Sequence, residues 1–115
     1  MSRQAKLERL AQLLKLVEIV STQRRGDLAR TQKASASIGA DIENLRQLRT
    51  EISAHQTDIA DIALLGRGDA AMRAKERSLL QDHALAEVSR LEATSLARKA
   101  EQKRLIIEAI LRQAS

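Results

Sequence analysis

The chain has 115 residues, no Cys, Pro, Phe, Tyr or Trp, four Gly and a formal net charge of +5. This length allows one domain, the lack of Cys excludes disulfides and thiolate metal sites, and the lack of aromatic side chains disfavours a broad globular core. Because strong helix formers dominate the remainder, the composition predicts an all-α fold with a narrow seam between long helices.

The charges fall into three zones. Lys and Arg outnumber Asp and Glu by 8 to 3 in residues 1–35, are outnumbered 3 to 6 in 36–69, and lead 9 to 6 in 70–115. A protein that binds nucleic acid usually keeps one sign of charge along a face and offers stacking rings, so we expect no nucleic acid partner. Charged residues also interrupt the first 16 positions, which predicts a cytoplasmic protein with no signal peptide and no stable membrane insertion.

A heptad pattern marks the first half of the chain and predicts a helix over about 3–65. Steps of three and four residues run from Leu7 to Ala63, and 11 of the 17 positions are apolar. Gly26 lies where the seam becomes polar and is either a helix break or a soft spot. The uninterrupted phase favours a continuous helix. The expected seam residues are Leu7, Leu10, Leu14, Val17, Ser21, Arg24, Leu28, Thr31, Ser35, Ile38, Ile42, Leu45, Arg49, Ile52, Gln56, Ile59 and Ala63.

Two glycines in three residues predict a turn at 66–69, with Asp69 as the cap of a second helix over about 70–113. A short turn between long helices predicts an antiparallel coiled-coil hairpin, in which residues 1–115 form one domain and the first helix is the longer. The register of the second helix is less certain, and Leu85, Leu96, Ile106 and Ile110 offer a flanking stripe. Its expected seam is Leu80, Ala84, Val88, Leu91, Ser95, Arg98, Gln102, Leu105, Ala109 and Arg112.

A reversal near Arg67 would leave about the first 19 residues, some ~28 Å of helix, extending beyond the end of the second helix. This overhang is apolar over a wide arc and should bind something. Three possibilities are open: self-association into a dimer or four-helix bundle, a fold-back at Gly26 into a three-helix bundle, or a different protein. The residues expected to bind at this open end are Leu7, Leu10, Leu13, Leu14, Val17, Ile106 and Ile110.

Nothing in the sequence predicts catalysis. His55 and His83 have no partner at a recognised metal-ligand spacing, and no nucleophile elbow, phosphate-binding loop or dinucleotide fingerprint is present. The two Arg-Gly-Asp triplets, at 25–27 and 67–69, are interpreted as a glycine followed by a capping Asp. We therefore expect no catalytic residue, no metal and no cofactor.

The segment Ile42-Glu43-Asn44-Leu45-Arg46-Gln47-Leu48-Arg49-Thr50-Glu51-Ile52 resembles part of the first helix of the FliJ/YscO family, small coiled-coil proteins of flagellar and type III secretion export. That family often has Gln-Leu-x-x-Leu-x-x-Tyr-Arg-x-Glu-Tyr there. Ile42, Leu45, Arg49 and Glu51 match in type, whereas Asp41 replaces the Gln and Leu48 and Ile52 replace aromatic residues. Leu7-x-x-Leu10 and Asp27-Leu28-Ala29-Arg30 are similar to the family's opening.

The resemblance implies a non-enzymatic export component in the cytoplasm, with peripheral contact at the inner membrane left open. Family members insert paired termini into a hexameric export ATPase and contact the export gate and export chaperones. Leu45, Leu48, Arg49 and Ile52 would be the gate-contact residues carried over from the family motif. A self-associating structural coiled coil, a scaffold or adaptor that forms a homo-oligomer, is the alternative function.

Overall fold

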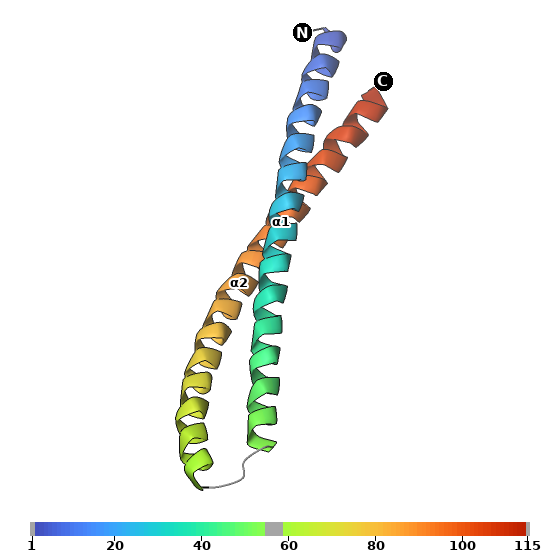
Figure 1. Ribbon diagram of the computed structural model, residues 1–115. Helices are drawn as coiled ribbons and strands as arrows, with labels where there is room; N and C mark the ends of the chain where they lie inside the picture. The colour runs from blue at the N-terminus through green and yellow to red at the C-terminus, as the bar shows by residue number, and fades with distance from the viewer. Residues whose placement is uncertain (1, 55–58, 115) are drawn as a thin grey trace. The chain divides into compact units, whose positions relative to one another are not determined.

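The computed structural model describes residues 2–54 and 59–114, and the side chains of 2–54 and 66–114. Two helices account for these ranges: α1 spans Arg3–Ala54 and α2 spans Ile59–Ala114 (Figure 1). No strand occurs in the ranges described. The expected all-α class with two long helices is confirmed.

The chain divides into two compact units. Unit 1 consists of Met1–Gln32 and Ser89–Ser115, and unit 2 of Lys33–Val88. Each unit therefore combines a segment of α1 with a segment of α2, and each is described by itself below.

Helix α1 is continuous through Gly26, which confirms the expected soft spot and excludes a fold-back there. Apart from the backbone of its own helix, a Cβ added at Gly26 would contact only Nη1 at the flexible end of the Arg30 side chain, at 3.6 Å. The helix is held locally by Arg30, which pairs with Asp27 one turn earlier. A glycine alone costs about 1 kcal/mol in a helix interior, which a long paired helix tolerates.

The expected turn at 66–69 is wrong. Gly66, Arg67, Gly68 and Asp69 all lie inside α2, and neither glycine has a positive φ. Asp69 does not cap a helix; instead it accepts a hydrogen bond from Arg49 Nε of α1 at 3.1 Å and pairs with Arg73 one turn later at 2.7 Å. These charge pairs favour helix at Asp69, although glycine propensity alone suggests a break.

The change of position also alters the lengths. Helix α1 ends at Ala54 and α2 begins at Ile59, so α1 has 52 residues and α2 has 56. Helix α1 is therefore longer than the part of α2 that begins at Gly66, but shorter than α2 as a whole.

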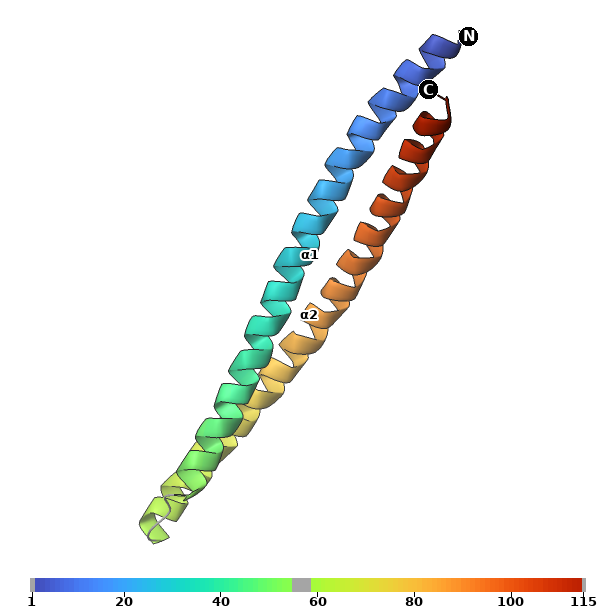
Figure 2. The ribbon, with the colours of Figure 1, turned by 90° about the vertical axis from the view of Figure 1, so that its right-hand side faces the viewer.

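In unit 1 the N-terminal segment of α1 and the C-terminal segment of α2 run antiparallel (Figure 2). Arg3 Nη2 donates a hydrogen bond to the carbonyl oxygen of Ala114 at 2.7 Å, and Ser21 Oγ donates to Glu101 Oε2 at 3.1 Å. Rising numbers in α1 thus meet falling numbers in α2. The predicted overhang of α1 is therefore wrong, because α1 ends at Ala54, α2 begins at Ile59, and the start of α1 pairs with the end of α2.

Unit 2 is also antiparallel. Ser35 Oγ lies 3.4 Å from His83 Nε2, Arg46 Nε donates to Glu76 Oε1 at 2.8 Å, and Arg49 bonds Asp69 as described above. The partner again falls in number as the α1 residue rises, as the expected hairpin requires.

The predicted seam of α1 is confirmed over the residues described. Every predicted position from Leu7 to Ile52 is buried or partly buried, with Ser21, Ser35 and Ile42 nearly inaccessible. The last three positions, Gln56, Ile59 and Ala63, lie outside the side chains described.

The predicted seam of α2 is wrong, because all ten of its positions are exposed. The seam is formed instead by Met72, Glu76, Leu79, His83, Ala86, Arg90, Ala93, Ala97, Ala100, Arg104, Ile107, Leu111 and Ala114, all buried or partly buried. These residues are also spaced by alternating steps of three and four, but they include more alanines and more ionisable side chains than the predicted seam. The reason is complementarity: the polar seam positions of α1 face ionisable side chains of α2, and alanines allow the two backbones to approach closely.

Replacing Gly66 and Gly68 with alanine distinguishes a helix from a turn at this point. A Cβ at either position meets nothing within 4 Å. We expect each Gly→Ala change to raise the free energy of unfolding in urea by about 0.5–1 kcal/mol, because alanine loses less backbone entropy in a helix.

The control is Gly68→Pro. It should be destabilising by about 3 kcal/mol, because proline removes a helical hydrogen bond. Destabilisation by both alanine variants would mean that residues 66–69 form a turn.

Candidate protein-binding site

The residues expected to bind a partner at the open end divide into two groups in unit 1. Leu7, Leu10, Leu14 and Val17 are partly buried in the seam against α2, whereas Leu13, Ile106 and Ile110 are exposed. The structure thus pairs the apolar ends of the two helices, contrary to the predicted overhang, and four of the seven candidates take part in internal packing. Only the exposed three remain accessible to another molecule.

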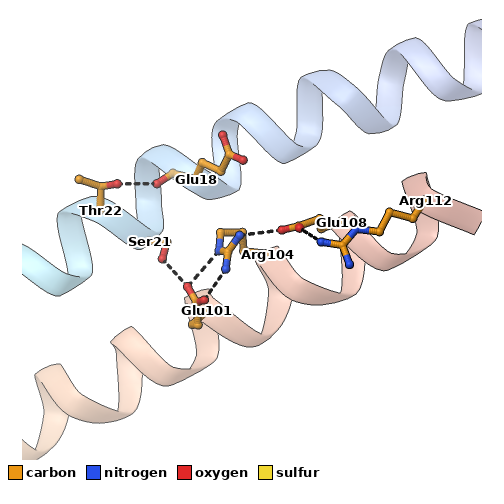
Figure 3. Close-up of polar contacts among 7 residues, drawn as sticks. All are labelled: Glu18, Ser21, Thr22, Glu101, Arg104, Glu108 and Arg112. Atoms are coloured by element: carbon orange, nitrogen blue, oxygen red, sulfur yellow. Dashed lines mark hydrogen bonds and ion pairs between the residues drawn. The ribbon is translucent and has the colours of Figure 1, made fainter. Parts of the chain in front are cut away.

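A polar cluster occupies the seam of unit 1 (Figure 3). Arg104 donates two hydrogen bonds to Glu101, at 2.6 and 3.1 Å, and a third to Glu108 at 2.7 Å. Ser21, which has no exposed surface, donates to Glu101 from α1, and Arg112 pairs with Glu108. Each charged member of the cluster is paired with another member, and the Ser21–Glu101 hydrogen bond joins α1 to α2.

This cluster fixes the charge state of Glu101. The Arg104 hydrogen bonds, with smaller contributions from Ser21 and from the positive charges of Arg104 and Arg25, lower the pKa of Glu101 from 4.5 to about 2 against the opposing effect of desolvation. The same hydrogen bonds raise the pKa of Arg104. Both groups stay ionised throughout the physiological range, which suits a structural ion pair and not an acid or base that exchanges protons.

Unit 2 repeats this design with different residues. Glu76 of α2 accepts hydrogen bonds from Arg46 and from Arg49, the latter at 2.6 Å. The Arg46 hydrogen bond is the main cause of a lowered pKa of Glu76. Further along, Ser35 contacts both His83 and Glu87. No buried side-chain nitrogen or oxygen in the described part of the chain lacks a hydrogen-bond partner.

The four residues carried over from the family motif are mostly internal. Leu45, Arg49 and Ile52 are partly buried in the seam of unit 2, and Leu48 is exposed. Leu45 and Leu48 line one side of an open pocket that Lys75 of α2 borders on the other. Three of the four therefore pack in the seam against α2, and Leu48 is the one of them that is exposed.

Sequence reasoning missed a set of exposed apolar residues on α2. Leu80, Leu85, Val88 and Leu91 point away from α1 although their size and spacing favoured a seam. One feature of the sequence could have shown that these residues are not in the seam. The ionisable residues of α2 recur with the same period as the polar seam positions of α1, and so could pair with them. These four apolar side chains consequently lie outside, while Glu76, His83 and Arg104 lie in the seam.

Neither a metal site nor a membrane span is found among the described residues. No three His, Cys, Asp or Glu side chains gather there in a way that could hold a metal ion. No described helix combines the length and the apolar character that crossing a membrane requires.

Comparison with protein-family models, curated proteins and solved structures gives no match.

The lowered pKa of Glu101 predicts an acid-dependent loss of stability. Because the pKa is about 2 when folded and 4.5 ordinarily, the stabilisation is complete above about pH 4.5 and is lost as the pH falls toward 2. We expect Glu101→Gln to lower the melting temperature at pH 7, measured by circular dichroism. Between pH 5 and 2.5 the melting temperature of this variant should decrease less than that of the unchanged protein. Glu92→Gln, which alters an exposed carboxylate of the same helix, should do neither. An unchanged pH dependence in Glu101→Gln would contradict the role of the cluster.

Two neighbouring leucines test the assignment of the seam. Leu14→Asp should be destabilising by about 2 kcal/mol or more, because it puts a carboxylate between α1 and α2. Leu16→Asp should stay within about 0.5 kcal/mol of the unchanged protein, because Leu16 is exposed. Urea unfolding measures both, and equal effects would refute the observed rotation of α1.

Proposed function

We propose that this chain is a non-enzymatic coupling protein of a flagellar or type III export apparatus. It docks to the export ATPase ring, the export gate and export chaperones through its paired helices. It acts in the cytoplasm, with peripheral contact at the inner membrane. The resemblance at residues 42–52 names this apparatus, and the surface of unit 1 supports a protein-binding role.

The observation that carries the proposal is the exposure of large apolar side chains. Of the 13 such residues exposed in the described part of the chain, nine belong to unit 1. Single exposed leucines are ordinary, but nine on one short helix pair represent apolar area that a partner would remove from water at roughly 25 cal/mol per Å². These residues are Leu13, Leu16, Ile19, Val20, Leu91, Leu96, Leu105, Ile106 and Ile110.

Pairing of the two chain ends supports entry into a ring. Arg3 is bonded to Ala114, so both ends of the chain lie together in unit 1. A blunt end made of two helices matches the family's mode of inserting paired termini into a hexamer better than a single projecting helix would. No active-site chemistry is required, since the energy for export would come from the ATPase.

Affinity purification tests this proposal. The tagged chain should recover a hexameric ATPase and other export components from its native cell, as identified by mass spectrometry. Leu16→Asp with Ile106→Asp should reduce that recovery about tenfold while leaving the circular dichroism spectrum unchanged, because both residues are exposed in unit 1. Recovery of the chain alone would contradict the export function.

A self-associating scaffold is the second candidate, and unit 2 offers an observation in its favour. Leu85 and Val88, which are about one helical turn apart on α2, are both more than half exposed. Unit 2 has 7 Lys and Arg against 9 Asp and Glu, a net charge of −2. Because this charge is small, electrostatic repulsion between two copies of unit 2 would be weak and would not prevent their association. This patch could join two copies as a four-helix bundle.

Light scattering during size-exclusion chromatography decides this second candidate. A dimer at micromolar concentration that Leu85→Lys with Val88→Lys converts to a monomer would support the scaffold. A monomer in both samples would exclude it. Arg77→Glu, an exposed change in the same segment that removes no apolar surface, controls for charge.

A further inference from the structure

The two sides of the helix pair in unit 1 differ. Consider the residues that directly precede a seam residue, such as Leu13 before Leu14 in α1 and Ile110 before Leu111 in α2. Each is rotated by about 100° from the seam, and in an antiparallel pair of right-handed helices this rotation leads to the same side from both helices. The large apolar residues of this side, named here the terminal face, are Leu13, Leu16, Val20, Leu96, Ile106 and Ile110.

The exposure of these residues agrees with that placement. Leu13, Val20, Leu96 and Ile110 are 41–45% exposed, as side chains flanking a seam should be. Leu16 and Ile106, at 62% and 60%, stand farther out. The opposite side, made of residues that directly follow a seam residue, has only Leu91 and Leu105 as large apolar members within unit 1. The terminal face is therefore apolar at the positions where a third helix would pack against a two-helix pair.

The balance of charge also differs between the two sides, although cations occur on both. Lys15, Arg25, Arg98 and Arg112 follow a seam residue and lie on the side that also holds most of the carboxylates. Four exposed cations, Lys6, Arg9, Lys99 and Lys103, each precede a seam residue and so border the terminal face. None of them takes part in an ion pair found among the described residues. Unit 1 as a whole has 13 Lys and Arg against 6 Asp and Glu, a net charge of +7.

Carboxylates lie mainly on the other side of unit 1. Glu8, Glu18, Glu101 and Glu108 each follow a seam residue. Among the carboxylates of the terminal face, Asp27 is already paired with Arg30, and Glu92 lies at the end of the unit away from the chain termini. The uncompensated charge bordering the apolar residues is therefore positive.

We infer that the terminal face binds an acidic amphipathic helix of a partner protein, which lies along both helices as a third strand of the coiled coil. The inference rests on the proposed protein-binding function and specifies the chemistry of the partner. Apolar residues of that helix would meet Leu13, Val20 and Ile110, and its carboxylates would meet the four bordering cations. A second copy of unit 1 is disfavoured because two units that each carry a net charge of +7 repel each other. A membrane surface is disfavoured because the chain has no Trp or Phe to anchor it.

Fluorescence anisotropy with a designed probe tests this inference. The probe is a labelled synthetic helix of about 20 residues with leucine on one stripe and glutamate elsewhere, and its twin has lysine for glutamate. The full chain should bind the glutamate probe, more weakly as salt rises, and bind the lysine twin at least about tenfold more weakly. Lys99→Glu with Lys103→Glu should weaken binding of the glutamate probe by about tenfold or more.

The matched control makes the same charge change in unit 2. Lys33→Glu with Lys75→Glu should alter binding of the glutamate probe by less than about threefold, because both lysines lie outside unit 1. Circular dichroism should show that all variants keep their helix content. Leu16→Gln, which removes apolar surface without changing the charge, should also weaken binding.

Several results would overturn the inference. These are no binding of the glutamate probe, equal binding of the lysine twin, or equal weakening by the unit 2 control. Binding only to vesicles containing phosphatidylserine would mean that the surface recognises a membrane, and a dimer abolished by Ile110→Asp would mean that it recognises a second copy. Recovery of an export ATPase by affinity purification is a separate measurement that none of these results decides. The inference and the proposed function can therefore fail independently.

Discussion

The structure depends on the pairing of polar side chains across the seam between α1 and α2. A serine or arginine facing another helix must find a hydrogen-bond partner, because an unpaired buried polar group is destabilising by about 1–3 kcal/mol. Helix α2 provides carboxylates and a histidine at the matching positions. The pairs are Ser21 with Glu101, Ser35 with His83 and Glu87, and Arg49 with Glu76 and Asp69. Such pairs select one register and one rotation among the many that leucine alone would allow.

That rotation leaves many of the large apolar residues of α2 outside the seam. Alanines fill the seam at Ala93, Ala97 and Ala100, all nearly buried, while Leu85, Val88 and Leu91 are more than half exposed. A helix pair that buries alanine and ion pairs gains less from the hydrophobic effect than one that buries leucine. The apolar surface that this leaves in water is the surface on which the proposed protein-binding function rests.

The charged residues of unit 1 are likewise divided between the seam and the surface. In unit 1 the carboxylates of Glu101 and Glu108 are used to hold Arg104 in the seam, whereas Lys99 and Lys103 remain exposed beside apolar residues. The result is a surface that is both apolar and basic. A partner helix that is both apolar and acidic would match it in each respect, and long-range attraction would speed its approach.

The sequence by itself determined the helical class, the antiparallel arrangement and the seam of α1. Composition left no alternative to helix, and the heptad spacing from Leu7 to Ile52 is a local property that α1 obeys in full. Tertiary structure alone decided where the chain reverses and which face of α2 is buried. Gly66 and Gly68 can adopt either helix or turn, and long-range pairing of Asp69 with Arg49 accompanies the helix. Likewise, hydrophobic pattern ranked Leu80 and Val88 above Glu76 and His83 as seam residues, because a single helix cannot show that its partner presents serine and arginine instead of leucine.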